Sequence, residues 1–222
     1  MFMGPLSGAG AQRGGRRYAF TRAAWGWLLA LVVVLLIFRA GTREPDSGEW
    51  SVFGYGAQWS ANNIGAILRG ETEFRASYLA VAGGSRTLYG YGRSLRLELE
   101  ANAAAHTGLQ HHSELNTALL VRWNRFPWDR LVNTSVAFGL GPSYAFRTPE
   151  VERHPRRPAS RLLVFMPVEI TFALPHDHNP RRELLLRIHH RSGAFGVVSD
   201  ARGSNFVSAG FRYRFSGEAG LE

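Results

Sequence analysis

The chain contains neither cysteine nor lysine. The absence of cysteine excludes disulfide frameworks, thiolate zinc sites and cysteine nucleophiles. All 26 basic residues are therefore arginines, whose guanidinium groups suit phosphate and carboxylate partners. Long amphipathic helical patterns are also lacking, and 222 residues suffice for one domain or one small barrel but not for two full-sized domains.

Positive charge is concentrated in the first forty residues, which hold five arginines and no acidic residue. The whole chain has 26 basic and 17 acidic residues, a formal net charge of +9. Without residues 1–40 the balance is 21 against 17, or +4. The remainder is only mildly basic, and we expect no nucleic-acid partner.

An apolar run, WGWLLALVVVLLIF, spans residues 25–38 behind four of these arginines. This order is typical of a secretory signal, and the run is shorter than the roughly 20 residues of a membrane-spanning helix. Because Phe38 and Arg39 stand where small residues favour cleavage, an uncleaved inner-membrane anchor remains the alternative. We predict a signal segment over 1–40, a barrel over 49–215 and a short tail over 216–222.

Apolar and polar residues alternate in most of the chain after residue 48, the pattern of barrel strands. In 94–105, for example, leucines at 95, 97 and 99 alternate with Arg96, Glu98 and Glu100. Eight such segments occur, over 49–59, 73–82, 94–105, 113–123, 134–146, 160–174, 182–192 and 204–215. The sequence therefore predicts an all-β fold, an eight-stranded antiparallel transmembrane β-barrel with an N-terminal signal segment.

The alternative fold is a soluble lipid-binding barrel, in which the apolar residues point inward and not outward. Here the polar faces carry both arginine and glutamate, which could pair inside a narrow lumen. Aromatic residues near segment ends favour a membrane barrel, since they are typical of the interfacial girdle. They are Trp50, Trp59, Trp123, Phe126, Trp128 and Tyr213.

If both chain ends of the barrel lie in the periplasm, the outer loops fall near 60–72, 106–112, 147–159 and 193–203. The third contains RTPEVERHPRRP. Its Arg153, Arg156 and Arg157 are candidates for binding lipopolysaccharide phosphates, although a solvated polar loop explains them equally well.

The segment RELLLRIHHRS, residues 182–192, places His190 and Ser192 on the same face as its leucines, hence toward lipid near the outer rim. A histidine close to a serine can take its proton and activate it as a nucleophile. The pattern HxS alone is weak evidence, since two polar rim residues would look the same.

The stretches HHRSGAFG and GSNFVSAGFRYRF resemble the carboxyl end of the lipid A 3-O-deacylase family, also described as acyloxyacyl-hydrolase-like outer-membrane proteins. The resemblance is sharpest over 183–215. It implies an eight-stranded barrel that hydrolyses an ester-linked acyl chain of lipid A, with Ser192 as nucleophile and His190 as general base. Backbone amides near Gly193 could stabilise the oxyanion.

The family's acidic third residue has no counterpart about twelve residues after the serine, where Ser204 and Asn205 stand. Asn205 shares the predicted lipid-facing side and could orient His190, as asparagine does in cysteine protease triads. Asp200, in the preceding loop, is the alternative. A non-catalytic barrel that binds or packs against lipopolysaccharide therefore remains the rival function.

No cofactor is expected, and no metal site. The His111–His112 pair and the HDH stretch at 176–178 are metal-binding residue types, but the sequence supplies no closed ligand set around them. The expected partners are lipid A or lipopolysaccharide, the bacterial outer membrane, and the barrel-assembly machinery during biogenesis.

Overall fold

The computed structural model describes residues 49–92, 94–155, 159–173, 182–194, 198–199 and 203–215. The predicted signal segment and tail lie outside these residues. The strands are β1 (Trp50–Ser60), β2 (Phe74–Tyr91), β3 (Leu95–Gly108), β4 (His112–Trp123), β5 (Asn133–Ala145), β6 (Leu162–Phe165), β7 (Val168–Ala173), β8 (Arg182–Ser192) and β9 (Ser204–Phe215). Two short helices, α2 (Ile64–Leu68) and η1 (Glu150–Glu152), lie between strands.

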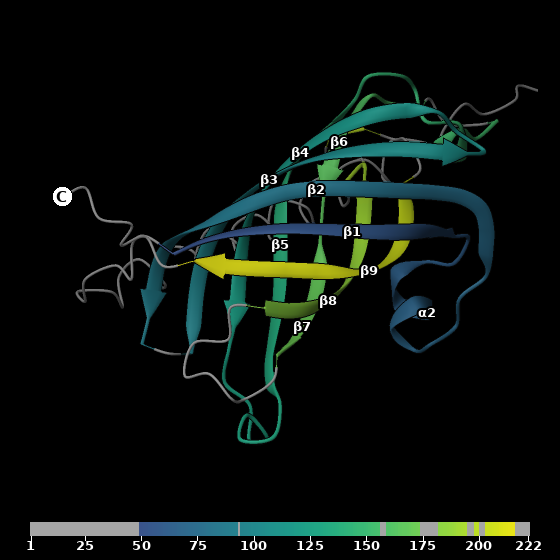
Figure 1. The fold of residues 1–222 in the computed structure, drawn as a ribbon. Coiled ribbons are helices and arrows are strands. Elements are labelled where there is room, and N and C mark those ends of the chain that lie inside the picture. The colour runs from purple at the N-terminus through teal and green to yellow at the C-terminus, as the bar shows by residue number, and fades with distance from the viewer. Residues whose placement is uncertain are drawn as a thin grey trace, which may run out of the picture. The chain divides into compact units, whose positions relative to one another are not determined.

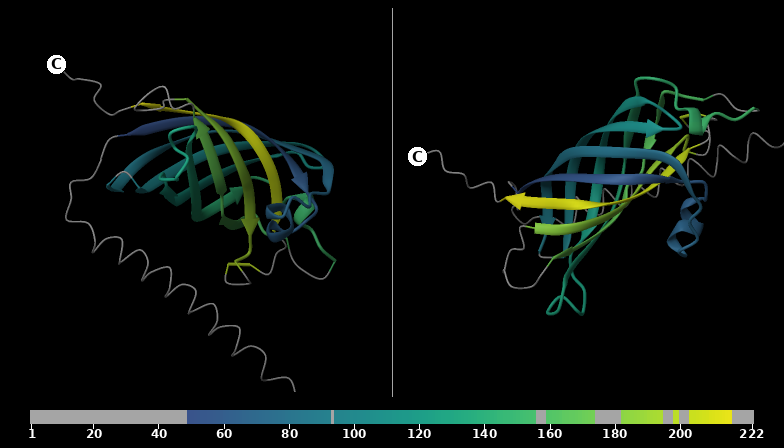
Figure 2. Two further views of the ribbon diagram at one scale, coloured as in Figure 1. Left: turned by 90° about the horizontal axis from the view of Figure 1, so that it is seen from below. Right: turned by 45° about the vertical axis from the view of Figure 1, so that its right-hand side comes forward.

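The strands close into one antiparallel barrel (Figures 1 and 2). Strands that follow one another in sequence pair with each other, apart from β6 and β7, and β1 pairs with β9 to complete the ring. β6 and β7 are two halves of one strand, since both pair with β5 on one side and β8 on the other. This confirms the predicted eight-stranded antiparallel barrel, in which closure removes every exposed strand edge.

The break between β6 and β7 falls at Met166–Pro167, where proline has no N–H to donate. The Met166 amide still donates to the His190 carbonyl at 2.8 Å, and the Pro167 carbonyl accepts from the Gly139 amide at 3.0 Å. Both neighbouring strands thus remain attached across the break.

β2 runs nine residues beyond the predicted end at residue 82. The predicted segment ends just before Gly83 and Gly84, yet both glycines lie within the strand. A Cβ at Gly83 would come within 2.5 Å of the Asn102 side chain and 2.7 Å of the Phe53 ring. This glycine therefore serves close packing inside the barrel, not a change of direction.

The lumen is filled by paired charges. Arg187 donates to both carboxylate oxygens of Glu100, at 2.6 and 2.7 Å, and also contacts Glu169. Arg122 bonds Glu98 and Glu169, each at 2.7 Å. These side chains are almost completely buried, which is tolerable only because each charge meets an opposite one.

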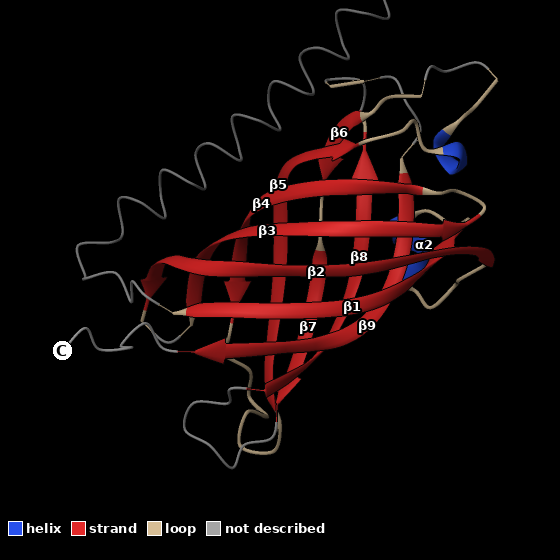
Figure 3. Cartoon of the chain, turned by 45° about the horizontal axis from the view of Figure 1, so that its top comes forward, coloured by secondary structure: helices blue, strands red, loops and turns tan. Residues whose placement is uncertain are grey.

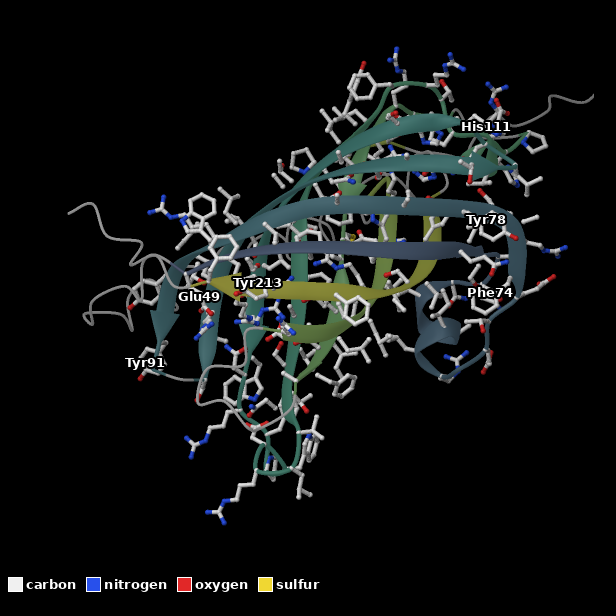
Figure 4. The ribbon with its side chains drawn as sticks, in the orientation of Figure 1. Glu49, Phe74, Tyr78, Tyr91, His111 and Tyr213 are labelled. Carbon is white, nitrogen blue, oxygen red and sulfur yellow. The ribbon has the colours of Figure 1, made fainter. Side chains whose placement is uncertain are left out.

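The outer face is apolar, with a belt of exposed leucine, valine and phenylalanine side chains. Figure 4 labels exposed aromatic residues at both ends of the barrel: Phe74 and Tyr78 at one, Tyr91 and Tyr213 at the other. Trp50 and Trp123 are also exposed, as an interfacial girdle requires. Trp59 is an exception to the sequence interpretation, because it packs against the aromatic cluster inside the lumen.

We call the end at which β1 begins and β9 finishes the terminal end. The other, the loop end, carries the connections 61–73, 109–111, 146–161 and 193–203, and here Figure 3 shows α2 in blue. Among the described residues, neither helix has the length and apolar composition needed to cross a membrane.

Candidate active site

β8 has two chemically different faces. Glu183, Arg187 and His189 point into the lumen, while Leu184 and Leu186 are exposed on the outer face. His190 and Ser192 continue the outer face at the loop end and are partly buried. The alternation of burial thus places both residues on the side that the sequence analysis predicted.

β9 brings Asn205 to His190 by strand pairing, because the two residues are direct partners in the β8–β9 register. The His190 Nδ1 lies 2.7 Å from Asn205 Oδ1 and 3.2 Å from the backbone carbonyl of Ser204. A carbonyl oxygen can only accept, so Nδ1 carries the proton. In neutral His190 the lone pair is then on Nε2, the nitrogen that a general base uses.

The orientation of Asn205 is fixed from its other side. Its Nδ2 donates to the backbone carbonyl of Asn62 at 2.9 Å. Asn62 precedes α2, whose N-cap Asn63 accepts the Ala66 amide through its side chain. The first loop therefore holds the Asn205 amide with its oxygen toward His190.

Ser192 ends β8 in a tight turn. Its Oγ accepts the Ala194 amide at 3.1 Å, which leaves the hydroxyl hydrogen free to be donated elsewhere. Ala194 has φ 51°, an uncommon left-handed conformation for a residue with a side chain. The turn places the Gly193 amide, the predicted oxyanion donor, directly after Ser192.

Gly203 closes this hairpin from the β9 side. A Cβ there would lie 2.0 Å from the Arg191 carbonyl oxygen and 3.1 Å from the Ser192 Cα. Only glycine permits the two chains to approach so closely beside the serine.

No hydrogen bond joins His190 to Ser192 among the contacts of the described residues. Residues two apart on a strand are separated by roughly 6.6 Å along it. The two side chains must therefore turn toward each other before a proton can pass, and such bonds often form only when substrate is present.

The surroundings of the pair are sheltered. Val164, the β6 partner of Ser192, and Ile188 occupy outward positions, yet they are only 6% and 7% exposed. Leu184, farther toward the terminal end of the same strand, is 43% exposed. The candidate site thus lies next to outward-facing apolar side chains that are buried, unlike those nearer the terminal end.

The third loop brings a buried carboxylate, that of Glu152, to this end, and it faces the lumen. It accepts from Arg191 Nη1 at 3.0 Å and from Ser204 Oγ at 2.8 Å. Burial raises the pKa of Glu152 to about 7, although the Arg191 guanidinium opposes this shift. Glu152 is therefore not the missing acid beside His190, but it ties the third loop to β8 and β9.

The other predicted site residues are placed as follows. Arg153 is exposed and pairs with Glu150 at 3.0 Å, so part of its charge is already compensated. Arg156, Arg157 and the alternative acid Asp200 lie outside the described residues, as does the HDH stretch. Sequence reasoning missed the roles of Asn62, Glu152 and Gly203, because each depends on contacts between distant segments.

An apolar outer belt, aromatic ends and a charge-paired lumen in a closed antiparallel barrel are the features of proteins that span the bacterial outer membrane. The chain is an outer-membrane β-barrel. No protein-family model matches it, and the comparison with curated proteins finds no relative.

Solved structures with a similar fold are outer-membrane proteins. The outer membrane enzyme PagL has 12% sequence identity and a TM-score of 0.52, with 73% of this chain and 98% of PagL covered. Neisserial surface protein A has 11% identity and a TM-score of 0.46, covering 76% and 98%. The N-terminal β-barrel domain of Pseudomonas aeruginosa OprF has 11% identity and a TM-score of 0.43, also covering 76% and 98%. The likeness to PagL supports the fold alone.

Proposed function

We propose that this barrel is a carboxylic-ester hydrolase that removes an ester-linked acyl chain from lipid A. The observation that carries the proposal is the His190–Asn205 hydrogen bond on the lipid-facing side, two residues from Ser192. It leaves the His190 Nε2 as a base on the face where a membrane-embedded ester would lie. The resemblance of residues 183–215 to lipid A deacylases supports the same substrate class.

In the proposed reaction, Ser192 Oγ attacks the ester carbonyl while His190 Nε2 takes its proton. The carbonyl oxygen becomes an oxyanion, which the Gly193 amide stabilises. Collapse of this intermediate expels the sugar alkoxide, which takes the proton from His190. Water, deprotonated by the same histidine, then releases the fatty acid and restores Ser192.

Asn205 acts here as a positioning residue. It holds Nδ1–H of His190 but supplies no negative charge to the imidazolium that forms in the reaction. We therefore expect it to contribute orientation without the electrostatic stabilisation of an aspartate or glutamate. The loop-end arginines Arg153, Arg156 and Arg157 are proposed to meet lipid A phosphates above the membrane.

The test is release of hydroxy fatty acid from purified lipid A by the barrel folded in detergent, followed by mass spectrometry. Ser192→Ala and His190→Ala should lower kcat/KM at least about 10³-fold, because they remove nucleophile and base. Asn205→Ala should lose less. Ser113→Ala, an exposed serine on β4 near the same end, is the matched control and should keep full activity. Activity surviving in folded Ser192→Ala would refute the mechanism.

The rival function is a non-catalytic barrel that binds or packs against lipopolysaccharide. The observations that favour it are the neutral Asn205 in place of an acid and the absence of a His190–Ser192 bond among the described contacts. Retention of lipopolysaccharide by the unmodified barrel without any acyl release would support this function instead. PagL, which has a similar fold, is described as an enzyme, so the fold does not exclude catalysis.

A further inference from the structure

The β3–β4 hairpin gathers a second group of reactive side chains at the loop end, away from Ser192. His106 on β3 and His112 on β4 are direct cross-strand partners, and their rings stack with centroids 4.1 Å apart. Glu114 follows His112 by two residues and therefore lies on the same lumen-facing side. Figure 4 labels the neighbouring His111 at this end of the barrel.

The donor atoms of His106, His112 and Glu114 all lie within 4.8 Å of one another. His106 is 4% exposed and Glu114 is fully buried, so a tight hairpin and the barrel wall hold both in place. A tetrahedral zinc ion with bonds of about 2.0–2.2 Å requires donors somewhat closer than this. Only the less buried His112 needs to rotate to close the difference.

Two polar atoms of the cluster lack partners among the described residues. His112 Nε2 and Gln110 Oε1 are both buried from solvent without a hydrogen bond. Buried polar atoms are satisfied in the great majority of cases, so two unpaired atoms in one cluster require an explanation. A bound cation would satisfy His112 Nε2 directly.

The other hydrogen bonds of the cluster suit an outer coordination shell. Glu114 Oε1 accepts from His189 Nε2 at 2.9 Å, and Oε2 accepts from His106 Nε2 at 3.2 Å. A metal ion bound between His106 Nε2 and Glu114 Oε2 would replace this second bond. Gln110 lies 2.8 Å from His106 Nδ1, and after rotation of its amide the unpaired Oε1 would accept from that nitrogen. Metal-binding histidines usually donate their second ring N–H in this way.

We propose that His106, His112 and Glu114 bind one divalent transition-metal ion of the zinc class. Imidazole nitrogen suits Zn²⁺, Ni²⁺ and Cu²⁺, whereas Mg²⁺ and Ca²⁺ prefer oxygen alone. An open cavity of about 530 Å³, lined by His106, His111 and His112, gives the ion access from the surface. This proposal differs from the sequence-based expectation, in which no closed ligand set was found around His112.

Two arginines set a limit to the affinity. Arg191 lies 3.4 Å from Glu114, and Arg147 lines the cavity. Arg191 is itself paired with Glu152 at 3.0 Å, so its repulsion of a cation is partly compensated. The site therefore binds zinc less tightly than one with two carboxylates and no nearby cation.

The experiment uses the detergent-folded barrel without a polyhistidine tag, titrated with Zn²⁺ by calorimetry at pH 7.5. We expect one ion per barrel, and no binding of Mg²⁺. His112→Ala should weaken zinc binding at least about tenfold, since even outer-shell changes cost that much. The matched control His111→Ala removes an exposed histidine of the same turn and should bind as the unmodified chain does.

Folding of each variant is checked by heat-modifiable migration on gels, and His112 is exposed enough for its alanine variant to fold. Zinc should also raise the unfolding temperature of the unmodified barrel but not of His112→Ala. No binding by the unmodified chain, or equal loss in His111→Ala and His112→Ala, would overturn the proposal. Because acyl release is assayed without added metal, the outcome is independent of the proposed esterase.

Discussion

Two adjacent histidines of β8 have opposite environments. His189 points into the lumen and is fully buried, and both ring nitrogens are occupied: Nε2 by Glu114 at 2.9 Å and Nδ1 by the Tyr55 hydroxyl at 2.8 Å. His190 faces outward, and its described bonds to side chain and backbone involve only Nδ1. The lumen thus uses a histidine as structure, while the outer face keeps one nitrogen available for chemistry.

The difference extends to the whole barrel wall. Inside, charged groups compensate one another, so that removing one partner leaves another buried and unpaired. Outside, side chains contact lipid, and polar groups are costly unless they serve a function. Substitutions on the two faces should therefore fail in different ways.

The largest effect is expected inside, at Arg187. Arg187→Ala would remove the bidentate partner of Glu100 and one of the arginines around Glu169, and should lower the free energy of unfolding by about 3–5 kcal/mol. Urea unfolding in lipid vesicles measures this. Arg153→Ala is the control, because its pair with Glu150 is more than half exposed and contributes no more than about 1 kcal/mol. Similar losses in both variants would contradict a charge-paired lumen.

A smaller loss is expected on the outer face. Phe138 is 49% exposed midway along β5, and Phe138→Arg should cost about 2–4 kcal/mol when the barrel is in a bilayer. Phe138→Leu keeps the position apolar and should fold almost normally. If arginine were tolerated as well as leucine, this face would not lie against lipid.

The smallest effects compare the two histidines directly. His189→Gln should lower the free energy of unfolding by about 1–3 kcal/mol, because it disturbs bonds to Glu114 and Tyr55. His190→Gln should lower it by no more than about 1 kcal/mol, because only the bonds of Nδ1 are disturbed, yet abolish the proposed acyl release. If His189→Gln and His190→Gln lost equal stability, and His190→Gln kept its activity, the two histidines would not have the different roles described here.

Much of the barrel could be predicted from alternation alone. The period of two in segments such as 94–105 fixes which residues face the lumen, and strands that alternate clearly also have nearly correct ends. The predicted end of the second strand, at residue 82, was wrong because β2 continues to Tyr91. Gly83 lies inside this strand and leaves room for Phe53 and Asn102, and Pro167 divides the predicted segment 160–174 into β6 and β7.

The candidate site was predictable only in part, for a related reason. The alternation of apolar and polar residues predicted that His190, Ser192 and Asn205 lie on the outer face of β8 and β9. The Asn62 carbonyl that orients Asn205 belongs to a loop 143 residues away in sequence, and no local pattern signals it. His106 likewise joins His112 and Glu114 only through the register of the hairpin, which the sequence leaves open.

The use of arginine alone for positive charge has a consequence for the tolerance of this barrel to extremes of pH. Guanidinium groups stay charged in any alkaline solution that a protein survives, whereas lysine would lose its proton. The guanidinium cations that pair with the lumen carboxylates therefore persist in base, and only the acidic partners of these pairs can lose their charge, at low pH. The barrel should withstand alkaline washing of membranes and loosen first from the acidic side.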